Sequence, residues 1–560
     1  METLKDTACV EQAPKKKKGL LFALIGAAVV VAGVLAFILW PRPLVTAPGY
    51  IAADLETAEL YTEEGTVRET LVRGTPVTFV VEEEDKDYPG MVRLVMGEDD
   101  LAYLKKENLT EDPKAVVTTK AMYVRTPVNL TDETGAVAGQ LVDKGQELTV
   151  IGFDELDTEG KVVRYIVRAG EAEGYVRAGY VTRTVDEAKA QYDAAVYQLH
   201  VDRGDDWGGG DAAGLDYFPR EKVKFADNVM PEKVKALYLN VEFIGELDTY
   251  LDIADNCGIN AFVIDIQDGG AIGYDSPTMQ KYSPSAYSSA YNTLAEYQAA
   301  VKKIKDAGYY IIGRITAFND PNMADDHPEH VIASTSTGNP QKIVGMYWPS
   351  VYSRYVWQYK VDLALEAAEL MGFNEIQFDY VRFPDGTWYY EDWELDYRNT
   401  YNESKAQAVQ RILMYAADRL HDAGVYVSAD VFGECAEAYV CSYGQYWPAI
   451  SNVVDVISAM PYPDHYAASG DWLPWEHPYD TMYGFGADAA ERQTETASPA
   501  VVRTWIQCYN AIVEPYTYYG PSQVSDQIEA LEDTGNTGGY MTWHGASSTG
   551  KYYSLMPAFD

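Results

Sequence analysis

The stretch EIQFDYVRFP, residues 375–384, is a short apolar run that carries an acidic residue, Asp379, and a basic one, Arg382. Its part that follows a helical segment, residues 375–380, is typical in length and apolar pattern of a buried strand in a parallel sheet. Seven further runs of this kind occupy residues 236–241, 261–266, 310–316, 425–431, 454–460, 501–507 and 539–543. Helical segments such as 294–307, 356–371 and 404–423 lie between them.

Eight strand and helix units in residues 233–560 predict an α/β fold, a C-terminal (β/α)8 TIM barrel with elaborated loops. Glycines that we expect to end helices in the left-handed conformation precede five of the strands. They are Gly258, Gly308, Gly372, Gly424 and Gly535. An open doubly wound sheet is the alternative, but no GxGxxG or phosphate-loop motif follows a run.

Polar side chains gather where these runs end, which is where the active sites of such barrels lie. Two carboxylates that face one cleft can cleave a glycosidic bond, one as acid and one as nucleophile or base. We expect Asp379 to be the nucleophile or base and Asp430 the acid, with Arg382 and Asp265 in support. The predicted substrate-binding residues are Asp268, Arg314, Glu434, Arg503, Trp505, Gln507 and Trp543. Each carboxylate has a structural alternative, in which it only braces the barrel rim.

Tryptophans also follow the predicted strand ends, and they are Trp348, Trp388, Trp393, Trp472 and Trp475. Aromatic faces stack on the C–H faces of sugars, so together these residues favour a carbohydrate cleft over a lipid pocket. For any single one of them, burial in a large loop is the simpler interpretation.

Four runs resemble a bacterial family of glycoside hydrolase domains. That family is named by prediction only and is related to the α-amylase-like barrels. The runs are 375–384, 428–433, 460–463 and 503–507. The resemblance covers about residues 233–545 and implies a TIM barrel and cleavage of sugars, with no established substrate. Two positions depart from the α-amylase-like pattern. Gln377 stands where those enzymes have an arginine, and the acid at strand five is Asp430 rather than a glutamate. Arg382, three residues after Asp379, is the candidate for the missing cation.

The N-terminus predicts a membrane anchor. Four lysines at 15–18 precede residues 19–40, which carry no charge and, as a helix, would reach about 33 Å. The lysines place residues 1–18 in the cytoplasm and the bulk of the chain outside a cell membrane that it crosses once. A cleaved signal peptide is the alternative, but its apolar region is usually shorter, about 7–15 residues.

Residues 50–184 are rich in short alternating runs, and they repeat. Gly74 and Gly145 are 71 residues apart, and Tyr103 and Tyr175 are 72 apart, which predicts a duplication. The copies, 50–111 and 115–184, resemble bacterial SH3-like domains, small all-β barrels. That resemblance implies binding of wall peptides or glycans, and a rigid spacer is the alternative. A helix at 185–199 and a linker fill residues 185–232.

Composition excludes several classes of protein. The net charge of −41 argues against binding of nucleic acid, whose phosphates it would repel. We expect no cofactor and no metal, and a polysaccharide or peptidoglycan as substrate. A non-catalytic protein that holds wall polymer is one alternative. A metal-dependent hydrolase is another, but the candidate ligands His327, His330, His465, His477 and His544 are scattered over the loops. The sequence leaves the oligomeric state open.

Overall fold

The computed structural model describes residues 30, 31, 44–81, 88–97, 100–192, 209, 212–391 and 393–559. Nearly all of the predicted anchor at 19–40, and the tail before it, therefore lies outside the described residues. Among the residues that are described, no helix is both long enough and apolar enough to cross a bilayer. The anchor stays a prediction.

Two all-β sheets precede the barrel, and they have the same topology. The first has the strand order β3-β2-β6-β5-β4-β1-β7, and the second has β10-β9-β13-β12-β11-β8-β14. Adding seven to each strand number of the first gives the second, as the predicted duplication requires. The strands of the first are β1 (Thr46–Ile51), β2 (Thr57–Tyr61), β3 (Val67–Val72), β4 (Pro76–Val80), β5 (Met91–Gly97), β6 (Asp100–Lys105) and β7 (Leu109–Thr110). Those of the second are β8 (Ala121–Val124), β9 (Val128–Thr131), β10 (Val137–Val142), β11 (Glu147–Phe153), β12 (Arg164–Ala169), β13 (Ala172–Arg177) and β14 (Val181–Thr182).

The chain divides into two compact units. One is Met1–Lys120 with Gly152–Val163, and the other is Ala121–Ile151 with Arg164–Asp560. In the first, Ile51, Leu60, Leu94 and Leu104 form the centre of a small apolar core. The helix predicted at 185–199 begins as expected, but α2 (Val185–Lys189) ends early, and residues 193–208 are not described.

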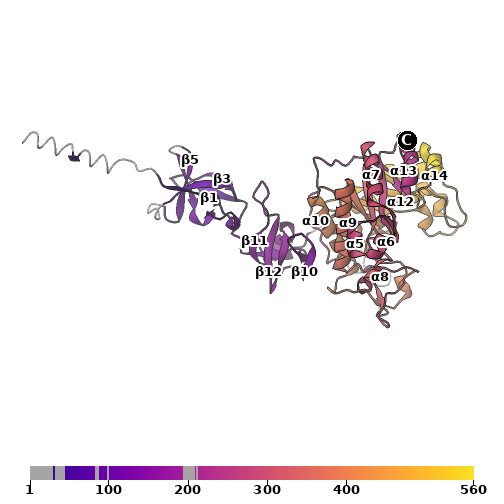
Figure 1. Cartoon of the computed structure of the whole chain (residues 1–560), viewed down its shortest axis with the longest axis horizontal. Helices are drawn as coiled ribbons and strands as arrows, with labels where there is room; N and C mark the ends of the chain where they lie inside the picture. The colour runs from indigo at the N-terminus through magenta and orange to yellow at the C-terminus, as the bar shows by residue number, and fades with distance from the viewer. Residues whose placement is uncertain are drawn as a thin grey trace, which may run out of the picture. The chain divides into compact units, whose positions relative to one another are not determined.

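The C-terminal region is a parallel barrel (Figure 1). Its strand order is β25-β24-β23-β21-β19-β16-β15-β27-β26. Only Arg503 separates β25 from β26, so these two form one interrupted strand that pairs with β24 at one end and β27 at the other. The eight predicted strands are thereby confirmed, and most of their ends lie within two residues of the predicted ones. They are β15 (Val234–Leu239), β16 (Ala261–Asp268), β19 (Tyr310–Thr316), β21 (Glu375–Asp379), β23 (Tyr426–Phe432), β24 (Val456–Met460), β25 (Val501–Val502), β26 (Thr504–Gln507) and β27 (Gly539–Trp543).

Helices connect these strands, and Figure 1 draws them around the barrel. The two longest, α9 and α10, begin at hydroxyl side chains, Ser353 and Ser404, that accept from the first turn. The helices are α4 (Leu247–Asp255), α5 (Pro277–Tyr282), α6 (Pro284–Ser288), α7 (Leu294–Asp306), α8 (Met323–Asp326), α9 (Arg354–Met371), α10 (Lys405–Asp422), α11 (Trp447–Ser451), α12 (Pro478–Thr494), α13 (Pro521–Asp533) and α14 (Thr549–Leu555).

The glycine prediction holds at four of its five positions. Gly372 ends α9 with φ +71°, and three of the others also have positive φ. Gly258 does not, so the left-handed interpretation is wrong there. A Cβ on Gly258 would lie 2.3 Å from the Phe559 carbonyl oxygen, so close packing requires glycine at this position.

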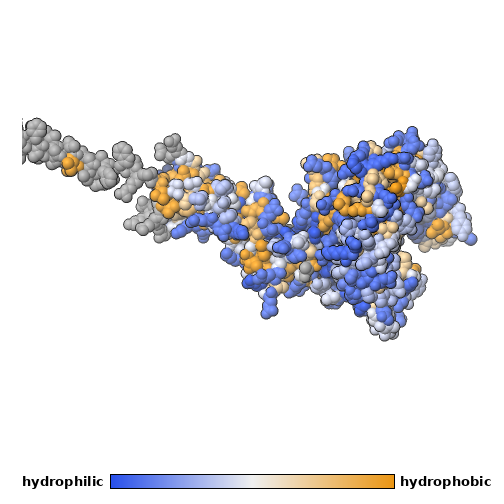
Figure 2. All heavy atoms as spheres, viewed as in Figure 1, coloured by the Kyte–Doolittle hydropathy of each residue, from blue (hydrophilic) through white to orange (hydrophobic). Residues whose placement is uncertain are grey.

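The loops at the C-terminal ends of the strands carry extra structure. After β16 come β17 (Ala271–Tyr274) and β18 (Ala290–Asn292), and β20 (Ala333–Ser334) pairs with β22 (Leu395–Asp396). On the face that Figure 2 shows, the surface of this region is mostly hydrophilic, as the net charge leads one to expect.

Candidate active site

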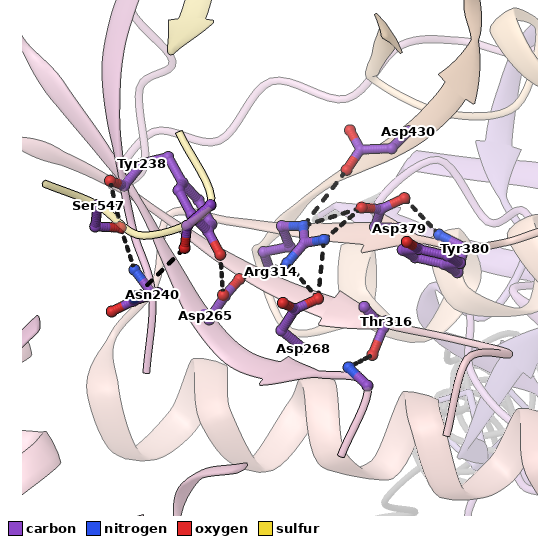
Figure 3. Close-up of polar contacts among 12 residues, drawn as sticks. Tyr238, Asn240, Asp265, Asp268, Arg314, Thr316, Asp379, Tyr380, Asp430 and Ser547 are labelled. Carbon is purple, nitrogen blue, oxygen red and sulfur yellow. Dashed lines mark hydrogen bonds and ion pairs between the residues drawn. The ribbon is translucent and has the colours of Figure 1, made fainter. Parts of the chain in front are cut away.

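Arg314, on β19, lies at the centre of four carboxylates (Figure 3). Its Nη1 donates to Asp265 Oδ1 at 2.7 Å and to Asp268 Oδ1 at 3.3 Å. Its Nη2 and Nε donate to Asp379 Oδ2, at 2.5 and 3.1 Å. Asp430 Oδ2 lies 3.9 Å from Nε. The barrel places these groups together because they lie near the C-terminal ends of four strands, with Asp265 and Asp268 on β16, Arg314 on β19, Asp379 on β21 and Asp430 on β23.

Asp379 is the last residue of β21, and both of its oxygens act as acceptors. Besides Arg314, the backbone N–H of Tyr380 donates to Oδ1 at 2.6 Å. Tyr380 has φ +50°, an unusual conformation for an aromatic residue. Strained residues of this kind are common at functional sites, and here the conformation turns the chain immediately after the carboxylate.

Asp430, on β23, is fully buried. Its Oδ1 accepts from Trp505 Nε1 at 2.8 Å, whereas Oδ2 has no hydrogen-bond partner among the described residues. Burial, followed by the charge of Asp379, raises the pKa of Asp430 well above its usual value, although Arg314 opposes this. The shift favours the protonated form of Asp430, and its free oxygen, Oδ2, lies 3.9 Å from Arg314 Nε.

The distance between the two predicted catalytic groups is bounded by Arg314. Asp379 Oδ2 and Asp430 Oδ2 lie 3.1 and 3.9 Å from the same Nε atom. They are therefore at most 7.0 Å apart, the sum of these two distances. Glycosidase carboxyls lie about 5–5.5 Å apart in retaining enzymes and about 6.5–9.5 Å apart in inverting ones. The bound fits retaining chemistry and only the short end of the inverting range.

Asp265 has a different environment from Asp430. Tyr238 donates its hydroxyl to Oδ2 and Arg314 donates to Oδ1, so both oxygens are engaged. Burial raises the pKa of Asp265 to about 7, and Arg314 opposes the shift. Because both of its oxygens are engaged, Asp265 holds Arg314 in place. The predicted supporting role agrees with these contacts.

The cation beside Asp379 is Arg314 and not Arg382, which corrects the sequence interpretation. Arg382 donates to the Phe383 carbonyl at 2.9 Å and to Asp385 at 3.2 Å. Its guanidinium packs over aromatic rings, with Phe432 the nearest at 4.4 Å. Arg314 comes from strand three, so the position two residues before Asp379 can be Gln377 without leaving the carboxylate uncompensated.

Arg503 was predicted to bind substrate, but it lies at the opposite end of the barrel. It donates to Glu375 at 2.8 and 3.0 Å, and Glu375 also accepts from Tyr310. Glu375 and Tyr310 are the first residues of their strands. Four residues at about 3.3 Å each place Glu375 roughly 13 Å below Asp379. Arg503 is therefore part of a buried structural ion pair.

Other predicted contacts divide into two groups. Asp268 has a side chain 41% exposed and can reach a ligand. Trp543 packs over the Arg314 guanidinium at 5.3 Å. Gln507 is buried, donates to the Tyr509 carbonyl and accepts from the Asp464 N–H, so it braces two loops. Glu434 accepts from Tyr439 and lines a separate cavity of about 260 Å³ with Trp472.

The predicted tryptophans also divide. Trp348 and Trp475 are buried, whereas Trp388, Trp393 and Trp472 are 54%, 71% and 40% exposed. Only these three can therefore meet a saccharide from solvent.

Sequence reasoning missed Tyr238 and Lys360. Tyr238 lies inside β15, and nothing in an apolar run marks a hydroxyl that reaches the next strand. Lys360 is buried on α9 and donates to Gln267 at 2.7 Å and to Asp320 at 2.8 Å. A lone lysine in an apolar helical face is a usable signal, since such a residue almost always has a partner.

Among the described residues, no group of three or more His, Cys, Asp or Glu side chains could hold a metal ion. The candidate histidines accordingly do not converge there.

Residues 236–549 match the model of a family described as "Putative glycosyl hydrolase domain". Among solved structures, a hypothetical protein from Ruminiclostridium thermocellum ATCC 27405 is 32% identical, over 35% of this chain and 97% of that one, with a TM-score of 0.30. The PgaB (BpsB) glycoside hydrolase domain from Bordetella bronchiseptica is 12% identical over 58% and 99%, with a TM-score of 0.39. A chitobiase of Flavobacterium johnsoniae is 12% identical over 58% and 48%, with a TM-score of 0.40. No curated protein matches the chain.

Proposed function

We propose that this chain, which belongs to the family described as "Putative glycosyl hydrolase domain", cleaves glycosidic bonds with Asp379 and Asp430. The observation that carries the proposal is the pair of unlike carboxyls around one guanidinium. Asp379 accepts hydrogen bonds at both oxygens, as a carboxylate does. Asp430 keeps its proton, because burial raises its pKa.

Each carboxyl then has one task. The proton of Asp430 belongs on Oδ2, because Oδ1 accepts from Trp505. From Oδ2 it passes to the oxygen of the departing sugar. Asp379 attacks the anomeric carbon or takes a proton from the attacking water, and Arg314 holds it in position. The bound of 7.0 Å on their separation favours direct attack and retention.

The proposed setting is the outer face of a cell membrane, with a wall or surface polysaccharide as the substrate. The apolar run at 19–40 and the duplicated all-β sheets support this setting, since the resemblance of those sheets to SH3-like domains implies wall binding. Fractionation of cells and protease treatment of intact cells test it. Full-length protein that stays in the soluble fraction would refute the anchor.

The assay for hydrolysis is the release of new reducing ends from purified wall sacculi and from a panel of α- and β-glucans. Full-length wild type should release them from at least one polymer, and Asp379→Asn should not. Asp306→Asn is the matched control, because Asp306 forms only an exposed ion pair with Lys302 on α7. Binding of sacculi without release from any polymer would favour the non-catalytic alternative.

A further inference from the structure

One histidine at the C-terminal face of the barrel has a fixed orientation that the chemistry above does not use. Asp464 and His465 follow β24, in the short helical turn Pro463–His465. His465 Nδ1 lies 2.8 Å from Asp464 Oδ1. A carboxylate only accepts, so Nδ1 carries a hydrogen, and in the neutral imidazole the lone pair is therefore on Nε2. The side chain of His465 is 49% exposed, while that of Asp464 is fully buried.

Asp464 is held from the neighbouring strand-seven loop. Tyr509 donates its hydroxyl to Oδ1 at 2.9 Å, and the Ile512 N–H donates to Oδ2 at 3.1 Å. The Asp464 N–H donates to Gln507. An exposed histidine that only caps a turn does not need a buried carboxylate with this many donors. The arrangement fixes both the tautomer and the direction of the imidazole.

The imidazole is connected through two aromatic rings, Tyr462 and Trp543, to Arg314, the partner of the carboxyl pair. Its ring centroid is 5.3 Å from that of Tyr462, in an edge-on contact. Tyr462 stacks parallel to Trp543 at 6.4 Å, and Trp543 lies over Arg314. After burial and Tyr509, the charges of Asp379 and Asp430 are what raise the pKa of the Tyr462 hydroxyl. Tyr462 thus packs between His465 and Trp543, the ring that covers Arg314.

We infer that His465 binds a hydroxyl of the saccharide through Nε2, next to the bond that is cleaved, with Asp464 as its positioning residue. This inference rests on the proposed function. An oriented Nε2 lone pair accepts from a sugar hydroxyl, which every neutral saccharide offers. The contact exists before and during the reaction, so it contributes to binding rather than to the chemical step.

Two substitutions separate this role from a structural one. Asparagine at 465 keeps an amide near the Nδ1 position and can still reach Asp464, but it removes the Nε2 position. Glutamine extends to the Nε2 position. His421→Asn is the matched control, because His421 also bonds a buried aspartate, Asp455, but at the N-terminal end of β24.

The substrate is the polymer in the panel from which wild type releases reducing ends fastest. We expect His465→Asn to raise KM about ten-fold, with kcat within about two-fold of wild type. His465→Gln should bring KM part of the way back to the wild-type value. His421→Asn should leave KM and kcat unchanged. Thermal unfolding of each variant shows whether it is folded. Folded His465→Asn protein with wild-type KM would overturn the inference alone. Wild type without activity on any polymer would overturn the proposed function and this inference together.

Discussion

Two buried arginines in one barrel allow a direct test of which end of the barrel performs the chemistry. Arg314 and Arg503 are 1% and 0% exposed, and each is paired with buried carboxylates. Replacement of either by glutamine leaves buried negative charge without a partner, which costs about 3–5 kcal/mol of unfolding free energy. At about 2.1 cal/mol/K per residue, the unfolding midpoint of the barrel, residues 233–560, should fall by roughly 4–7 °C.

The two variants should differ in activity, even though both are destabilised. Arg314→Gln removes the donors that hold Asp379, so reducing-end release per folded molecule should fall by at least about 100-fold. Arg503→Gln breaks the ion pair with Glu375, which lies roughly 13 Å along β21 from Asp379, and should keep wild-type activity per folded molecule. The folded fraction comes from circular dichroism at the assay temperature.

A double variant strengthens this test. Arg503→Met with Glu375→Met removes both charges, and it should regain most of the stability lost in Arg503→Gln, because a buried ion pair is replaced by apolar packing. Loss of activity per folded molecule in Arg503→Gln, or its retention in Arg314→Gln, would refute the assignment of the two ends.

Three further results are expected. The pKa of Asp265 is raised to about 7, so the folded state holds a proton that the unfolded state releases near pH 4. Its contribution to the free energy of unfolding is therefore present below about pH 4 and is lost as the pH rises to 7. Urea unfolding at pH 4.5 and 7 should show a smaller fall in this free energy for Asp265→Asn than for wild type, and an equal fall would contradict the shift. Trp505→Phe removes a hydrogen bond that lowers the pKa of Asp430, so the alkaline limb of the pH profile of kcat should move to higher pH. Trp447→Phe is the control, because it removes a comparable indole hydrogen bond to Gln493 and should leave the alkaline limb unchanged. Dialysis against EDTA should leave reducing-end release at the wild-type rate, and a loss restored by one divalent metal would revive the metal-dependent alternative.

Much of the barrel could be predicted from the sequence because a parallel strand buried on both faces is a continuous apolar run. The predicted bounds of β19 and β27 are the same as those observed. Strand seven was also predicted, but its interruption at Arg503 was not, because the pattern of apolar residues does not show which backbone pairs with which neighbour.

The site was predicted less completely than the fold. Asp379 and Asp430 come together because each lies at or near the C-terminal end of its strand, which is a rule of position. The predictions for Arg503 and Arg382 were wrong because the sequence does not show where a charged side chain points. Arg503 pairs with Glu375 at the opposite end of the barrel, and Arg382 pairs with Asp385 in its own loop. The role of Arg314 as the common partner depends on side-chain direction across three strands, which no local pattern encodes.

The four carboxylates around Arg314 also bear on which polymers the site can accept. Even with protons on Asp265 and Asp430, Asp268 and Asp379 outnumber the one guanidinium that binds them. On a protein of net charge −41, this gives the bound sugar a negative surrounding potential. Uronic acids, sulfated glycans and phosphodiester-linked polymers would be repelled on approach. Neutral saccharides, and those with free amines, would enter without that cost.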